Sequence, residues 1–82
     1  MYWELRSAPH TDLLGYSDDL DDVLSLTREC IEGGFPLQEL YVCAEWREGE
    51  QGDDADLPPV LSGPELASRA QAAHAKRTPR SA

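Results

Sequence analysis

The sequence predicts a small α+β domain in which an antiparallel sheet of three or four strands is covered on one face by an amphipathic helix. Three observations indicate this class. Apolar and polar residues alternate in segments 2–7 and 40–46, with the period of two that is typical of half-buried strands. Apolar residues recur at helical spacing in segment 20–32, and an alanine-rich segment at 64–76 predicts a second, weaker helix. The expected order is therefore strand, strand, helix, strand, a short fourth strand and helix.

The length of the chain limits what this fold can bury. With 82 residues the chain is long enough for one domain, which we expect to cover residues 1–76, followed by a flexible basic tail at 77–82. A domain of this size buries only about 60% of the surface that its unfolded chain exposes. Small cores are often completed by disulfides, metals or self-association, and the last of these is the favoured expectation here.

The first two strands form an expected hairpin. Residues 2–7 make the first strand, the polar stretch 8–12 makes a turn, and residues 13–16 make the second strand. Two short strands joined by such a loop are typical of an antiparallel pair. Gly15 lies inside the second strand, which predicts a bulge or a close approach of another part of the chain.

The clearest helical pattern follows at residues 20–32. One face collects the apolar and small residues at helical spacing, namely Leu20, Val23, Leu24, Thr27, Cys30 and Ile31. Ser17, Asp18 or Asp19 can accept a hydrogen bond from an unpaired amide of the first turn, where the helix dipole also favours negative charge. Gly33 and Gly34 are typical of a helix C-terminus.

Three of these acids form a metal-binding pattern at the helix start. Asp18, Asp19 and Asp22 read DDxxD, which resembles the aspartate-rich motif of prenyl-diphosphate enzymes. The resemblance implies magnesium ions that hold a diphosphate, but those enzymes are large all-helical proteins with a second acidic motif facing the first. Here the resemblance covers five residues, and capping accounts for acids in a first helical turn. We therefore expect no metal site at this position.

The remaining chemistry-bearing residues are few. Cys30 and Cys43 lack CxxC spacing and clustered histidines, so a structural zinc site with four ligands is not expected. His10 and His74 lie far along the chain from either thiol, and nothing local pairs a nucleophile with a base. The sequence predicts no catalytic residue, no metal and no cofactor.

The third strand lies within residues 35–48, and we expect it to be the longest and most central strand. Acids and glycines in segment 49–56 predict a solvated loop, because the ligand spacing of a calcium loop is absent. Pro58 and Pro59 lead into the apolar pair at 60–61, which predicts a short edge strand.

The second helix should begin with the capping box that Ser62 and Glu65 form. Its apolar stripe is thin and consists of Leu66, Ala67, Ala70 and Ala73. A stripe of alanines buries little area, so we expect this helix either to dock lightly or to be completed by another chain.

The alternation in the strands assigns side chains to the two faces of the sheet. The face toward the first helix should carry Trp3, Leu5, Leu40, Val42, Ala44 and Trp46. The opposite face should carry Tyr2, Tyr16, Tyr41 and Cys43, which we take as a candidate interaction surface because aromatic residues are enriched at interfaces. The alternative is that the second helix folds back over this face.

Charge is the strongest compositional signal. The net charge is −9, and all sixteen acidic residues lie in residues 1–65. Such a body repels phosphate backbones, so direct binding to nucleic acid is not expected. Acids that could meet a basic partner are Asp21, Asp22, Glu29, Glu32, Asp53 and Asp54.

The sequence also bears on location. No apolar run approaches the roughly 20 residues needed to span a bilayer, and the first ten residues lack the pattern of a signal peptide. We therefore expect a cytoplasmic protein with reduced thiols and no membrane partner. Abundant alanine and arginine with a single lysine favour a bacterial source.

Two function classes follow. The first is a non-catalytic, self-associating interaction module, most simply a homodimer, that acts as an accessory or adaptor protein. The second is an inhibitor or antitoxin-like protein whose acidic surface mimics nucleic acid and binds to the basic site of a partner protein.

Overall fold

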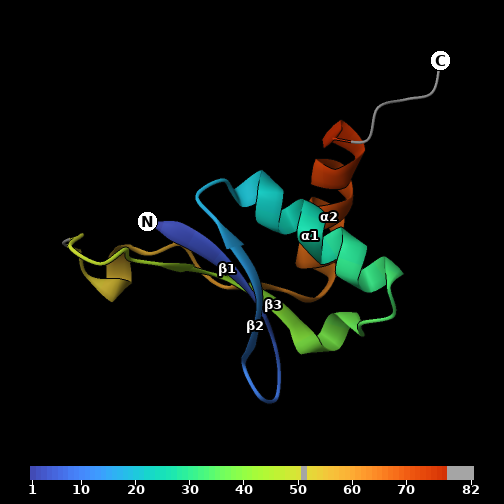
Figure 1. The fold of residues 1–82 in the computed structure, drawn as a ribbon, viewed down its shortest axis with the longest axis horizontal. Coiled ribbons are helices and arrows are strands. Elements are labelled where there is room, and N and C mark those ends of the chain that lie inside the picture. Colours follow the sequence, from blue (N-terminus) through green and yellow to red (C-terminus); the bar gives the residue numbers. More distant parts are fainter. Residues whose placement is uncertain (51, 78–82) are drawn as a thin grey trace.

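The computed structural model describes residues 1–50 and 52–77 and confirms the expected α+β class. Its helices and strands follow the predicted order (Figure 1). They are β1 (Tyr2–Ser7), β2 (Asp12–Ser17), α1 (Leu20–Glu32), β3 (Leu40–Glu45), β4 (Leu61–Ser62) and α2 (Gly63–Arg77), with single 3-10 turns at Leu37–Glu39 and Asp54–Asp56. Of the predicted basic tail, Arg77 is the last residue of α2, and residues 78–82 lie outside the described residues.

The four strands form one antiparallel sheet in the order β2-β1-β3-β4. β1 pairs on both sides, and its register places Leu5 opposite Val42 of β3 and Gly15 of β2. β3 is internal as expected, but it is no longer than β1 or β2, because each of the three has six residues.

Both expectations for Gly15 are confirmed. Leu5 pairs with Gly15 while the next residue, Arg6, pairs with Leu13, so Leu14 is the extra residue of a bulge. A Cβ at Gly15 would collide with the side chain of Leu26. The missing side chain therefore lets α1 pack closely on the hairpin, and Leu26 joins the helix face that packs on the core.

The ends of α1 are capped as the sequence predicts. Asp19 is the N-cap, and its Oδ1 accepts a hydrogen bond of 3.0 Å from the backbone N–H of Asp21. At the other end, Gly34 has φ of 109°, and the N–H of Phe35 donates to the carbonyl of Cys30 at 3.0 Å. A positive φ costs glycine nothing, so the helix ends here with its last carbonyls bonded.

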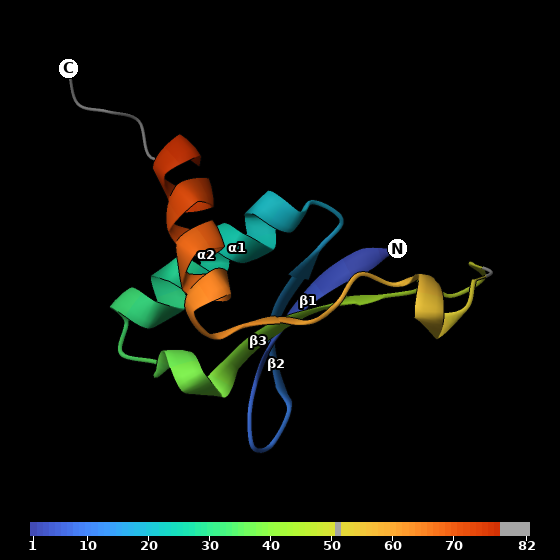
Figure 2. The ribbon, with the colours of Figure 1, turned by 180° about the vertical axis from the view of Figure 1, so that it is seen from behind.

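Both helices lie on the same face of the sheet (Figures 1 and 2). The apolar core lies between them and the strands, and its buried members are Leu5, Val23, Leu24, Leu40, Val42, Ala44, Leu61, Leu66, Ala70 and Ala73. Trp46 was expected in this layer but lies beyond the end of β3, where its ring occupies the space beside Gly52. β3 ends at Glu45, so the alternation of side chains between the two faces does not extend to Trp46, and the loop after the strand sets the position of this residue.

The alanine stripe of α2 docks within the chain. Leu66 and Ala70 are fully buried, and α2 packs chiefly against α1. Small side chains allow the backbones of two helices to approach closely. The alanine stripe of α2 therefore completes the core against α1, although each alanine buries little area. The expectation of a light contact is therefore wrong for this helix.

This close contact predicts the effect of enlarging Ala70. Replacement of Ala70 by leucine should lower the free energy of unfolding by about 1–3 kcal/mol, because a filled core has no room for three more carbon atoms. Urea denaturation measures the loss. The exposed Ala72 on the same helix is the control, and Ala72→Leu should change stability by no more than about 0.5 kcal/mol. Equal losses in both variants would contradict the packing.

Candidate functional site

The face of the sheet opposite the helices is open. We call it the open sheet face and define it by Tyr2, Glu4, Arg6, Tyr16, Tyr41 and Cys43. Strand pairing puts these residues together, because Glu4 pairs with Tyr16 on one side and with Cys43 on the other, while Arg6 pairs with Tyr41. Within residues 1–50 and 52–77 no helix covers this face, so the alternative of a folded-back second helix is not what the structure adopts.

One end of the open sheet face is aromatic. The rings of Tyr2 and Tyr16 meet edge to face with centroids 6.1 Å apart, and the guanidinium of Arg47 lies 5.4 Å from the centroid of Tyr2. Arg47 also forms an ion pair with Asp18. An open cavity of about 270 Å³ lies here and is lined by Tyr2, Glu4, Leu13, Tyr16, Arg47 and Glu48. Partial burial, followed by the hydrogen bond to Glu4, raises the pKa of the Tyr2 phenol.

The centre of the face holds a buried carboxylate. Glu4 is only 5% exposed, which is unusual for an acid on an uncovered sheet face. Arg6 donates from Nε to Oε1 at 3.0 Å and from Nη2 to Oε2 at 3.2 Å, and the hydroxyl of Tyr2 donates to Oε2 at 3.1 Å. The hydrogen bond to Glu4 raises the pKa of Arg6. A bidentate ion pair of this kind compensates for the loss of hydration of the buried carboxylate.

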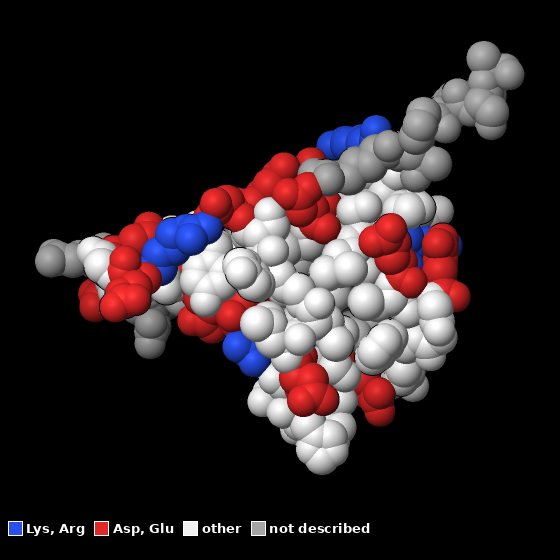
Figure 3. All heavy atoms as spheres, in the orientation of Figure 1, with Lys and Arg blue, Asp and Glu red and all other residues white. Residues whose placement is uncertain are grey.

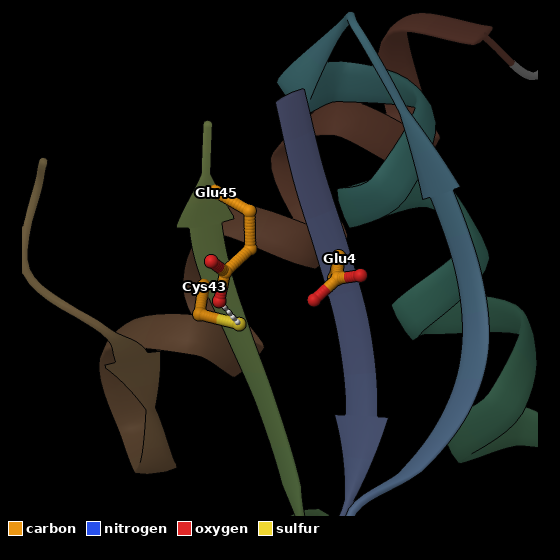
Figure 4. Close-up of side chains that lie close together, drawn as sticks. All are labelled: Glu4, Cys43 and Glu45. Carbon is orange, nitrogen blue, oxygen red and sulfur yellow. Dashed lines mark hydrogen bonds between the residues drawn. The ribbon is translucent and has the colours of Figure 1, made fainter. Parts of the chain in front are cut away.

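Beside Glu4 lies a second feature that the sequence did not predict. Figure 4 shows Glu4, Cys43 and Glu45 close together on β1 and β3, with one ligand atom of each within 4.8 Å of the others. The Glu45 side chain bends back along β3, so that its Oε1 lies 3.9 Å from the sulfur of Cys43. Burial, then the charges of Glu45 and Glu4, raise the pKa of the Cys43 thiol. A protonated thiol among carboxylates is a poor nucleophile, because the thiolate is the reactive form.

The three acids of the DDxxD pattern have separate partners. Asp19 caps α1, Asp18 pairs with Arg47, and Asp22 accepts a hydrogen bond of 2.8 Å from the hydroxyl of Ser17. The expectation that capping accounts for Asp18 is wrong, because this residue lies before the N-cap and its carboxylate turns to the strand side of the molecule. Capping is confirmed for Asp19.

The acids expected to meet a basic partner are spread over the molecule. Glu29 and Glu32 are exposed on α1, whereas Asp21 and Asp22 are half-buried near its start. Asp53 is exposed in the loop after β3, and the side chain of Asp54 lies outside what the structure describes. On the side shown in Figure 3, acidic side chains gather over both ends of α1 and over the loop at 48–56. A basic group lies between the loop and the start of α1, and uncharged surface lies between the two ends of α1.

Comparison of the chain with protein-family models, with curated protein sequences and with solved structures gives no match. Neither described helix is long and apolar enough to cross a bilayer.

Proposed function

We propose that this protein is a non-catalytic interaction module that forms a homodimer through the open sheet face. The observation that carries the proposal is the placement of both helices on one side of the sheet, with three tyrosines on the other. Tyr16, which is 67% exposed, stands at the edge of this face. Aromatic side chains contribute much contact area at low conformational cost, and small cores gain stability from association.

The charges on the open sheet face support a second copy as the partner. Arg6 and Arg47 lie on or beside this face together with Glu4, Glu45 and Glu48, so the face carries charges of both signs. The chain as a whole is strongly acidic, with a net charge of −9, so two copies would repel each other through the rest of their surface. A two-fold interface brings the same patch from both copies together, so each arginine can approach a carboxylate of the other copy.

The chemistry of the face supports a non-catalytic role. The Cys43 thiol donates a long hydrogen bond of 3.9 Å to Oε1 of Glu45, and burial together with the nearby carboxylates raises its pKa, which favours the unreactive protonated form. Two free cysteines fit the reducing cytoplasm, which we propose as the location. A protein that binds a partner without catalysing a reaction would act as an accessory or adaptor protein.

A charge placed in the proposed interface should separate the two copies. We expect sedimentation equilibrium to show a dimer for the unmodified protein and at least about a tenfold higher dissociation constant for Tyr16→Glu, since a buried unpaired charge costs more than 1.4 kcal/mol. Tyr16 is mostly exposed, so the folded monomer should tolerate the change.

The matched control is Val60→Glu, which adds the same charge at an apolar residue that is 56% exposed and lies outside the open sheet face. This variant should dimerise like the unmodified protein. A monomer at every concentration, or equal weakening by both substitutions, would overturn the homodimer.

A second candidate function is binding to a basic protein through the acids of α1, as in an inhibitor that mimics nucleic acid. The exposed Glu29 and Glu32 favour it, although the acidic groups visible in Figure 3 are not continuous. Such a complex should weaken strongly between low salt and about 0.15 M salt, because screening acts on exposed charges. A homodimer held by aromatic contacts should respond much less, so the salt dependence of association distinguishes the two.

A further inference from the structure

We propose that Glu4, Cys43 and Glu45 form a binding site for a thiophilic divalent cation of the zinc class. This inference does not depend on the proposed dimer, because all three ligands come from one chain. One ligand atom of each residue lies within 4.8 Å of the others, so a common ion needs only small side-chain adjustments. Among the described residues this is the one group of three or more metal-ligating side chains gathered so closely.

Strand register builds the site. Glu4 of β1 pairs directly with Cys43 of β3, and Glu45 follows two residues later on the same face of β3. Side chains at such positions of an antiparallel pair lie next to each other. The ligands therefore stand on two internal strands of the sheet, which hold them more firmly than a loop would.

Glu4 is already arranged as a metal ligand would be. It is nearly buried, and its carboxylate is fixed by Arg6 and Tyr2. Each carboxylate oxygen has two lone pairs, so hydrogen bonds from these residues leave Oε1 able to bind an ion. Carboxylates that ligate metals are commonly held by such outer hydrogen bonds, and the positive Arg6 also limits the net negative charge of the site.

Glu45 brings a second carboxylate to the thiol. This residue is exposed and could extend into water, yet its side chain bends back to the sulfur of Cys43 and toward Glu4 (Figure 4). Arg6 pairs with Glu4, but the carboxylate of Glu45 still approaches Glu4 and the thiol, and like charges at this distance repel each other. A divalent cation would remove this repulsion, with the thiol proton passing to the solvent as sulfur binds the ion.

The donor set selects the class of ion. Magnesium and calcium bind oxygen ligands, whereas thiolate sulfur favours zinc and related metals. Zinc sites with three protein ligands keep a fourth position for water or another donor. The combination of one sulfur and two carboxylate oxygens therefore fits zinc with one open position.

Cobalt(II) is the test probe, because it occupies zinc sites and gives a thiolate-to-metal absorption band when sulfur binds it. We expect titration of the reduced protein with Co²⁺ to produce this band at one ion per chain, and addition of Zn²⁺ to remove it. Cys43→Ser should abolish the band. The matched control Cys30→Ser, which removes the other thiol, should keep it.

The carboxylate contribution is tested by a second pair of variants. Glu45→Gln should weaken Co²⁺ binding at least tenfold, whereas Glu48→Gln, which removes a neighbouring exposed acid, should change it less than twofold. Circular dichroism before titration verifies that each variant is folded. No band in the unmodified protein, its loss in Cys30→Ser, or its persistence in Cys43→Ser would overturn the proposal. A monomeric protein that still binds cobalt would contradict the dimer and leave the metal site standing.

Discussion

Replacement of Leu5 by alanine is expected to lower the free energy of unfolding by about 2–5 kcal/mol. Leu5 is fully buried in β1, the strand that pairs on both sides, and belongs to the core beneath both helices. Truncation removes buried apolar area and leaves a cavity that strands held on both sides cannot close. Small domains have total stabilities of only about 5–15 kcal/mol, so a large part of the fold's stability depends on this side chain.

Urea denaturation followed by circular dichroism measures the Leu5 effect. The control is Leu13→Ala on β2, since Leu13 is 46% exposed at the edge of the sheet. Its loss should stay within about 0.5 kcal/mol. A Leu5 variant as stable as the Leu13 variant would mean that the core is not centred on β1.

The second large effect is expected at Arg6. Replacement by methionine keeps an unbranched apolar stem but removes the guanidinium, which leaves the buried Glu4 carboxylate with the Tyr2 hydroxyl as its remaining side-chain donor. A buried acceptor that loses its partners costs about 1–3 kcal/mol, and more when it is charged. We therefore expect Arg6→Met to destabilise the protein by at least about 1 kcal/mol, measured by urea denaturation at neutral pH.

Two comparisons isolate the cause. Arg28→Met removes an exposed ion pair with Glu32, four residues apart on α1, and should cost no more than about 0.5 kcal/mol. Arg6 also donates from Nη1 to the carbonyl of Thr11 at 2.7 Å, so part of its effect comes from the hairpin loop. The double variant Glu4→Gln/Arg6→Met removes the buried charge and should regain stability relative to Arg6→Met alone. If it does not, the loop contact and not the buried pair explains the loss.

Most of the secondary structure could be predicted from the sequence because its signals are local. β1 has the predicted bounds, and α1 begins and ends where Asp19 and Gly33 indicate. The assignment of Leu5, Val42 and Ala44 to the core face is confirmed as well. Alternation in a strand fixes which side chains share a face, whatever the strand pairs with.

The group of Glu4, Cys43 and Glu45 could not be predicted in the same way. Two separate strands supply its members, and only their pairing register decides that Glu4 stands opposite Cys43. Alternation assigns Glu4 and Cys43 to one face but leaves open how far apart they lie along the strands. The sequence could have shown that acids and a cysteine share one face of the sheet, but not that they stand opposite each other.

The chain's sequence alone determined the identity of the elements and the two faces of the sheet, because propensity, capping and periodicity act over a few neighbouring residues. Tertiary structure decided that α2 joins α1 over the core, that Trp46 leaves the core layer, and that a thiol meets two carboxylates. These features depend on how elements distant along the chain pack together. Packing is chosen by the whole set of buried contacts and by strand register, which no single segment encodes.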